Sequence, residues 1–197
     1  MRIDKTLLKK MVKEKPLLLD HEWSGAVVFL CTSKEVFFIM RSLDMPTHKG
    51  QVGFFGGHKK TGETPEEAAL REFCEETSLD KKQIECLGAL NPVRTSSGKP
   101  FVPIVCYYPG EFRDILDDAQ SNGEWSDAFI YPWEQLCDES RWSYGVSHGL
   151  SSFPVLFHTL RRPYLQSKYN RSESYLLWGA TALMVWQLVS QLIYKES

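Results

Sequence analysis

GHKKTGETPEEAALREFCEETSL, residues 57–79, decides the fold, because its middle part carries several independent signals of a helix. Thr64 stands at the N-cap position, Pro65 suits the first helical position, and Glu67 completes a Thr-x-x-Glu capping box. The sequence therefore predicts a helix that begins just after Thr64. Its apolar stripe, at spacings i, i+1 and i+4, is formed by Ala69, Leu70 and Phe73.

The same helix carries an acidic cluster at Glu72, Glu75 and Glu76. Residues at i, i+3 and i+4 share one helix face, so these carboxylates project together and repel one another. They also lie in the last turns, where the helix dipole disfavours anions. One interpretation is a solvated acidic face partly relieved by Arg71. The other is compensation by divalent cations, since carboxylate oxygens suit Mg2+ and Mn2+.

The spacing of these residues resembles the Nudix box, G-x5-E-x7-R-E-U-x-E-E-x-G-U, in which U is a bulky apolar residue. Here Gly57 and Glu63 are followed by the run Arg71-Glu72-Phe73-x-Glu75-Glu76-x-x-Leu79. Ser78 replaces the second glycine, which serves a left-handed turn after the helix. The resemblance implies an α/β fold, an α/β/α sandwich with a central mixed sheet and the box helix packed against it.

The resemblance also implies an activity and a metal site. Nudix enzymes hydrolyse a nucleoside diphosphate linked to another group and use divalent ions, here Mg2+ or Mn2+. By this likeness the metal ligands are Glu72, Glu75, Glu76 and the region of Gly57, and the pair of Arg71 and Glu63 orients these acids. The general base stays open between three residues, namely Glu75, Glu76 and the downstream Glu124.

The segment ahead of the box resembles the coenzyme A pyrophosphatase branch of this family, R-S-x-x-L-x-x-H-x-G-Q/E-V-x-F-P-G-G. Its matching residues imply substrate-binding roles for Arg41, Ser42, His48 and Gln51. Phe55 departs from the pattern, because the branch has proline there. A second, weaker match is the run LWGATA at residues 177–182.

The implied substrate is therefore coenzyme A or an acyl-CoA, cleaved to 3',5'-ADP and 4'-phosphopantetheine. Nucleotide sugars, ADP-ribose and dinucleotides are the alternatives within the family. A catalytically silent module that senses a nucleotide is an alternative of another class, which the loss of a box acid would favour. All the box acids are present.

Composition predicts a soluble globular protein whose residues 1–197 form a single domain. The chain has 197 residues, 43% of them hydrophobic, and a net charge of -2. A strongly basic patch is missing from the sequence, so we expect a small-molecule nucleotide as the partner and not a nucleic-acid polymer.

The five cysteines are scattered, and we interpret them as reduced thiols. The N-terminal residues lack the apolar run of a secretory signal, which predicts a cytoplasmic location. A homodimer remains an open alternative to a monomer.

The remaining pattern predicts strands separated by turns, and the expected strand ranges are 24–31, 35–40, 51–55, 84–93 and 101–108. Strands combined with one clear helix predict a layered α/β domain. Residues 1–20 are predicted as a helical extension. Residues 174–194 are free of charge, and we expect a helix that packs on the sheet and does not span a membrane. The sequence gives no assignment for residues 141–171.

Overall fold

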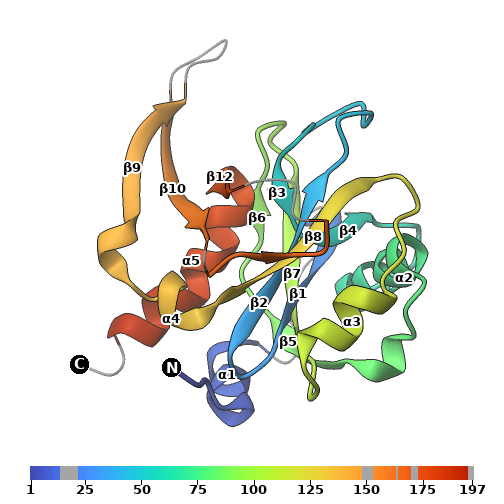
Figure 1. Cartoon of the computed structure of the whole chain (residues 1–197). Helices are drawn as coiled ribbons and strands as arrows, with labels where there is room; N and C mark the ends of the chain where they lie inside the picture. Colours follow the sequence, from blue (N-terminus) through green and yellow to red (C-terminus); the bar gives the residue numbers. More distant parts are fainter. Residues whose placement is uncertain (14–21, 148–152, 163, 170–172, 195–197) are drawn as a thin grey trace.

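The computed structural model describes residues 1–13, 22–147, 153–162, 164–169 and 173–194 (Figure 1). In this part of the chain nine strands form a central sheet. They are β1 (Gly25–Cys31), β2 (Glu35–Arg41), β3 (Val52–Gly53), β4 (Phe55–His58), β5 (Glu85–Ala89), β6 (Val93–Arg94), β7 (Pro100–Tyr107), β8 (Trp125–Pro132) and β11 (Gln166–Ser167).

The central sheet is mixed, as predicted. Its main order is β11-β8-β2-β1-β7-β5, while β3 pairs with β2, β4 with β1 and β6 with β7. The pairing of β1 with β7 is parallel, and the other pairings are antiparallel. β1 and β2, both predicted as strands, pair antiparallel as a hairpin. A second sheet has the order β12-β10-β9, formed by β9 (Trp142–Ser147), β10 (Phe153–Arg161) and β12 (Ser174–Trp178).

The helices lie on both sides of the central sheet (Figure 1). They are α1 (Lys5–Met11), α2 (Pro65–Thr77), α3 (Phe112–Asp118), α4 (Trp133–Leu136) and α5 (Gly179–Tyr194), with single 3-10 turns at Lys81–Gln83 and Glu139–Arg141. In Figure 1, α2 and α3 cover one face, and α5 lies beyond the other face together with the second sheet. This arrangement is the layered α/β architecture that the sequence predicts.

The apolar run of β1 explains why this strand is buried on both faces of the sheet. All seven of its residues are buried, and alternate side chains point to opposite faces of a strand. Val27 and Phe29 join the core that contains the buried residues of α5, whereas Val28 and Leu30 join the core under α2 and α3. A strand buried on both faces is a continuous hydrophobic run, which is the pattern visible in the sequence.

The predicted boundary of the C-terminal helix is wrong. Ser174–Trp178 forms a strand, and the helix begins only at Gly179, whose φ is +63°. The physical reason is the local burial period: Tyr175 and Leu177 are buried while Leu176 between them is exposed, which is the alternation of a strand. Among the described helices, none is both long and apolar enough to cross a membrane.

The N-terminal segment contains a short helix. Asp4 caps α1, with its side chain accepting a hydrogen bond from the Thr6 N–H. Leu8 and Met11 bury that helix in the core shared with α5. Of the predicted helical extension, residues 14–20 lie outside the described part of the chain.

The box helix α2 begins as predicted. The Glu67 N–H donates to Thr64 Oγ1 at 3.3 Å, and the Thr64 N–H donates to Glu67 Oε2 at 2.9 Å. These two bonds form the predicted capping box, and Pro65 is the first helical residue. Phe73 and the small residues Ala68 and Ala69 are buried against the sheet, which lets the helix approach β1 and β4 closely.

Ser78 ends this helix in the left-handed conformation that glycine would favour. Its φ and ψ are 62° and 13°, and its N–H donates to the Cys74 carbonyl oxygen at 3.0 Å. The left-handed turn is therefore kept although the residue carries a side chain.

We expect a Ser78→Gly protein to unfold with a free energy larger by about 0.5–1 kcal/mol, because relief of the left-handed strain exceeds the added entropy of the unfolded chain. Equilibrium unfolding in urea measures this difference. A Ser78→Ala protein is the control, since alanine keeps the strain and should give no gain. A Ser78→Gly protein no more stable than the natural one would contradict this account of the turn.

Candidate active site

The three acids of α2 lie at different depths. Glu76 follows Ala69 and Phe73 at spacings i+7 and i+3, so it continues the buried stripe of the helix and is only 1% exposed. The side chain of Glu72 is 18% exposed and that of Glu75 is 51% exposed. The predicted cluster therefore runs from the protein interior to solvent.

Glu76 is the most unusual of these residues because a carboxylate is rarely buried without partners for both oxygens. Its Oε1 accepts a hydrogen bond from the Gly56 N–H at 3.2 Å, and its Oε2 is buried without a hydrogen-bond partner. Burial raises the pKa of Glu76 to about 8, the negative charges of Glu124 and Glu72 add to the rise, and the Gly56 N–H opposes it. Such a carboxylate requires a cation or a proton.

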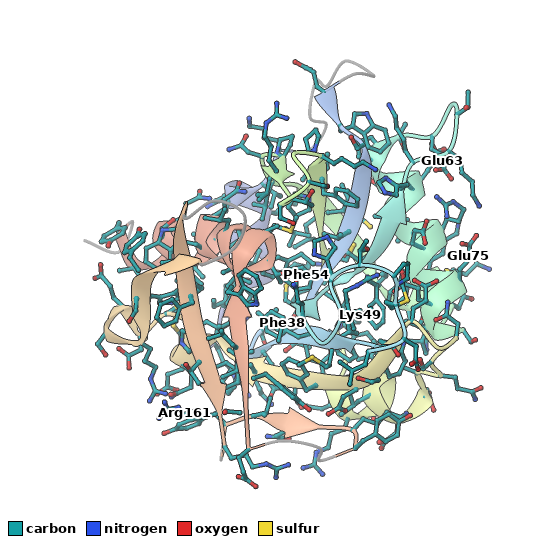
Figure 2. All side chains as sticks on the ribbon, turned by 90° about the horizontal axis from the view of Figure 1, so that it is seen from above. Phe38, Lys49, Phe54, Glu63, Glu75 and Arg161 are labelled. Carbon is teal, nitrogen blue, oxygen red and sulfur yellow. The ribbon has the colours of Figure 1, made fainter. Side chains whose placement is uncertain are left out.

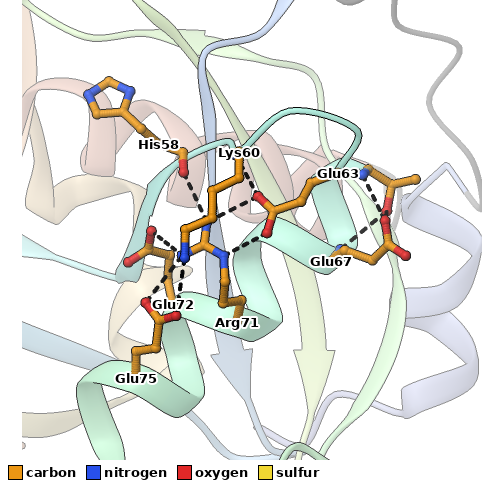
Figure 3. A network of polar contacts seen from close by, with 8 residues as sticks. His58, Lys60, Glu63, Glu67, Arg71, Glu72 and Glu75 are labelled. Carbon is orange, nitrogen blue, oxygen red and sulfur yellow. Dashed lines mark hydrogen bonds and ion pairs between the residues drawn. The ribbon is translucent and has the colours of Figure 1, made fainter.

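Arg71 organises the outer part of the cluster (Figure 3). Its Nε and Nη2 donate to the two oxygens of Glu63 at 2.6 and 3.0 Å, which is a bidentate pair. Its Nη1 donates to Glu72 at 2.7 Å and to Glu75 at 3.2 Å, and Nη2 also reaches the His58 carbonyl oxygen at 3.0 Å. The hydrogen bonds from Arg71 lower the pKa of Glu63 to about 2. The predicted pair of Arg71 and Glu63 thus fixes the loop ahead of α2 to the helix.

Lys60 adds a second cation to this network. Its Nζ lies 3.4 Å from Glu75 Oε1, and its backbone N–H donates to Glu63 Oε2 at 2.6 Å. The side chains of both Lys60 and Glu75 are more than half exposed, so solvent screens this contact. Seen from above, Glu63 and Glu75 lie on the side of α2, and Arg161 lies on the opposite side of the molecule (Figure 2).

Gly57 lies in β4 directly against the acid cluster. A Cβ atom at this position would be 2.5 Å from Glu72 Oε1, which is closer than real Cβ contacts occur. Because the contacted atom is the end of a flexible side chain, a larger residue would push the Glu72 carboxylate aside and leave the fold intact. Glycine at position 57 therefore allows the carboxylate of Glu72 to lie directly against the backbone of β4.

We therefore expect a Gly57→Ala protein to lose most of the hydrolytic activity that the resemblance to the Nudix box implies and to change little in thermal stability. Steady-state kinetics on the best substrate measures the loss of activity, and a thermal melt measures the change in stability. Gly53→Ala is the matched control, because a Cβ there would meet no atom outside its chain neighbours closer than 3.9 Å. Full activity of the Gly57→Ala protein would show that the position of the Glu72 carboxylate is unimportant.

The residues present fit a divalent cation in their chemistry. Carboxylate oxygens are the ligands that Mg2+ and Mn2+ prefer, and Glu76 Oε2 is a buried oxygen without a hydrogen-bond partner. In the described part of the chain, three acidic, histidine or cysteine side chains nowhere converge closely enough to hold an ion as they stand. Arg71 occupies one oxygen each of Glu72 and Glu75 instead. Glu72 and Glu75 would therefore have to turn to share an ion with Glu76.

The predicted residues Arg41, Ser42 and Glu124 come together beside Glu76. Arg41 ends β2 opposite Trp125, and the Ser42 N–H donates to the Glu124 carbonyl oxygen at 2.8 Å. Glu124 lies close enough for its charge to raise the pKa of Glu76, and the charge of Arg41 lowers that pKa. Arg41 Nε is buried without a hydrogen-bond partner. The turn after β2 and the start of β8 thus bring a guanidinium and a fourth carboxylate to the acids.

His48 and Gln51 belong to the loop between β2 and β3. His48 Nδ1 lies 3.1 Å from Gln51 Oε1, and His48 has a left-handed φ of 57°. The Gln51 carbonyl oxygen accepts from the Arg41 N–H at 3.0 Å, which ties this loop to the end of β2. Lys49, in the same loop, is labelled in Figure 2.

Trp125 has a positioning contact that sequence reasoning missed. It is buried, and its indole Nε1 donates to the Glu76 carbonyl oxygen at 2.9 Å. Its ring packs edge-on against Phe55, with ring centroids 6.2 Å apart. Trp125 is therefore part of the core of the domain. Only its place next to Glu124 hinted at the link with α2.

Comparison with known proteins shows the family of the chain. The family model of the NUDIX domain matches residues 22–147. Nudix hydrolase 3 of Caenorhabditis elegans is 28% identical over 173 residues, which are 82% of this chain and 69% of that protein. The uncharacterized Nudix hydrolase NudL of Shigella flexneri is 28% identical over 192 residues, 96% of this chain and 91% of that protein.

Among solved structures, the chain is similar to RenU, a Nudix hydrolase from M. smegmatis. The TM-score is 0.48 and the identity 17%, over 59% of this chain and 74% of that one. Since the family model covers well over half of the sequence and both relatives are Nudix hydrolases, this protein belongs to the NUDIX family and is a hydrolase of that family.

Proposed function

We propose that this protein is a metal-dependent pyrophosphohydrolase that cleaves a nucleoside diphosphate linked to another group, with coenzyme A or acyl-CoA as its substrate. The observation that carries the metal-dependent part is the buried Glu76 carboxylate, whose Oε2 has no partner. The fold alone does not require an anion at this depth, and it would be more stable with an apolar residue there. A carboxylate in that place is explained by the ion it would bind.

In this proposal Glu72, Glu75 and Glu76 hold Mg2+ or Mn2+, near the backbone of Gly57. When bound, the ions would neutralise charge on the pyrophosphate and lower the pKa of an attacking water. Glu76 is fixed for this role by the Gly56 N–H and, through its backbone, by Trp125. Glu72 and Glu75 each have one oxygen bonded to Arg71, and they would turn to reach the ion.

Arg71 and Glu63 act as positioning residues in the proposed site. Their bidentate pair holds the loop ahead of α2 against the helix, and this pair can persist when Glu72 and Glu75 turn toward an ion. Released from the two glutamates, Nη1 would keep positive charge beside the substrate phosphates. Glu124 is the proposed general base, because it lies beside Glu76 without being part of the box.

The substrate assignment rests on the segment ahead of the box. Arg41, Ser42, His48 and Gln51 match the coenzyme A pyrophosphatase pattern, and the fold brings Arg41 and Ser42 beside Glu124. A guanidinium with a free Nε is suited to a phosphate group. We propose that Arg41 contacts a substrate phosphate and that the paired His48 and Gln51 contact the substrate from the neighbouring loop.

The test is product analysis with the purified protein and Mg2+ or Mn2+, across coenzyme A, acetyl-CoA, ADP-ribose, nucleotide sugars and dinucleotides. The expected result is preferential conversion of coenzyme A to 3',5'-ADP and 4'-phosphopantetheine. Preference for another compound would overturn the substrate assignment and keep the pyrophosphohydrolase. Absence of cleavage across the whole panel would overturn both and favour a silent nucleotide-binding module.

A further inference from the structure

Two cysteines that are not part of the acid cluster face each other across neighbouring strands. Cys86 of β5 and Cys106 of β7 are directly paired residues, so their side chains point to the same face of the sheet. Their Sγ atoms lie 2.9 Å apart, and both cysteines are free thiols. A disulfide bond is about 2.05 Å long, and it needs Cα atoms about as far apart as those of residues paired across strands.

The two thiols differ in how oxidants can reach them. Cys86 is half-buried on β5, the last strand in the order of the central sheet, whereas Cys106 is fully buried in the core under α2 and α3. Burial raises the pKa of the Cys106 thiol and shields it from solvent, so an oxidant in solution reaches Cys86 first. Cys86 is the accessible thiol, and Cys106 is the one within reach to react with it.

We propose that Cys86 and Cys106 form a reversible oxidation site, at which a hydroperoxide converts the two thiols to an intramolecular disulfide. This step is independent of the proposed hydrolysis. First, Cys86 Sγ attacks the peroxide, an S–O bond forms as the O–O bond breaks, and water or an alcohol leaves. Then Cys106 Sγ attacks the sulfenic sulfur, the S–S bond forms, and the hydroxide leaves as water with the Cys106 proton. Two thiols are oxidised and one peroxide is reduced.

Geometry favours this outcome over further oxidation of Cys86. A sulfenic acid with a thiol in contact condenses to a disulfide, whereas an isolated one proceeds to sulfinic acid. The product would join the edge strand β5 to β7, which pairs with the central strand β1. Since the cross-link closes a loop between residues 20 apart in sequence, it restricts the unfolded chain.

The experiment treats the purified full chain with a small molar excess of hydrogen peroxide, denatures it and counts the thiols that react with iodoacetamide. The reduced protein should show all five cysteines as thiols, and the oxidised one should lack two of them. Peptide mass mapping should find Cys86 joined to Cys106, and dithiothreitol should restore both thiols. The oxidised protein should also melt roughly 5 °C higher than the reduced protein.

Variants make the test specific. Cys86→Ser and, as a second variant, Cys106→Ala should form no intramolecular disulfide. Cys74→Ser is the control, because Cys74 is also half-buried beside the same core, and this variant should still form the cross-link. The proposal is overturned if the natural chain keeps five thiols, if Cys86 becomes sulfinic acid, or if the cross-link joins a different pair.

Discussion

A Glu76→Gln protein is expected to lose hydrolytic activity by roughly 10²–10³-fold or more and to keep its fold. Glutamine has nearly the shape of glutamate, and its amide oxygen still accepts the hydrogen bond from the Gly56 N–H. It lacks the negative charge that a divalent ion requires. The loss should appear in kcat with Mg2+ and with Mn2+, and raising the metal concentration should restore little of it.

The free energy of unfolding of the Glu76→Gln protein shows whether the carboxylate of Glu76 serves function or stability. The natural Glu76 side chain is buried with one unpartnered oxygen and a raised pKa, so a neutral amide in its place should not lower the free energy of unfolding of the metal-free protein. Added Mn2+ should raise the melting temperature of the natural protein and not that of Glu76→Gln. Glu66→Gln, at an exposed position in the first turn of α2, removes the same charge and should behave like the natural protein. A Glu76→Gln protein with natural activity would refute the metal assignment.

An Arg71→Lys protein is expected to lose about 10–100-fold in activity, the effect typical of residues that orient metal ligands. Lysine keeps the positive charge and loses the planar fork of donors. It therefore cannot bond both oxygens of Glu63 and reach the helix acids at the same time, as Arg71 does. We expect weaker metal binding, measured by calorimetric titration with Mn2+, together with a lower kcat.

Two controls keep this prediction specific. Arg94→Lys changes an exposed arginine that bonds the Gly98 carbonyl oxygen, and it should leave metal binding unchanged. Glu63→Gln should reproduce the Arg71→Lys defect, because it breaks the same pair from the other side. Natural metal affinity and kcat in Arg71→Lys would mean that charge alone suffices and that the bidentate pair serves only the fold.

Local signals in the sequence were enough to predict the box helix. The capping box, the proline at the first helical position and the stripe of Ala69, Leu70 and Phe73 act within a few residues of one another. Each appears in the structure, with Leu70 only partly buried. The apolar run of β1 likewise reveals a strand buried on both faces. These features depend on neighbours in sequence, so the pattern alone determines them.

The depth of each acid was not predictable in the same way. Helix periodicity places Glu72, Glu75 and Glu76 on one face, but the packing of β4 and β8 decides that Glu76 is the buried one. The bond from Trp125 to Glu76 spans 49 positions in the sequence, and the contact of Cys86 with Cys106 spans 20. Such contacts follow from strand order, which the sequence pattern does not specify.

The boundary between β12 and α5 was missed for a different reason. Residues 174–194 are uniformly uncharged, which favoured one continuous helix. The alternation around Tyr175 and Leu177 is only five residues long, and pairing with β10 is what makes it a strand. Gly179, with its left-handed φ, was the local signal that a new element begins there.

The most direct test of the central claim is an anomalous difference map from crystals of this protein grown with Mn2+. We expect a peak at bonding distance from Glu76 Oε2, with Glu72 and Glu75 turned to the ion and the Arg71–Glu63 pair still in place. A map without manganese at Glu76, in crystals where Arg71 still bonds Glu72 and Glu75, would contradict it.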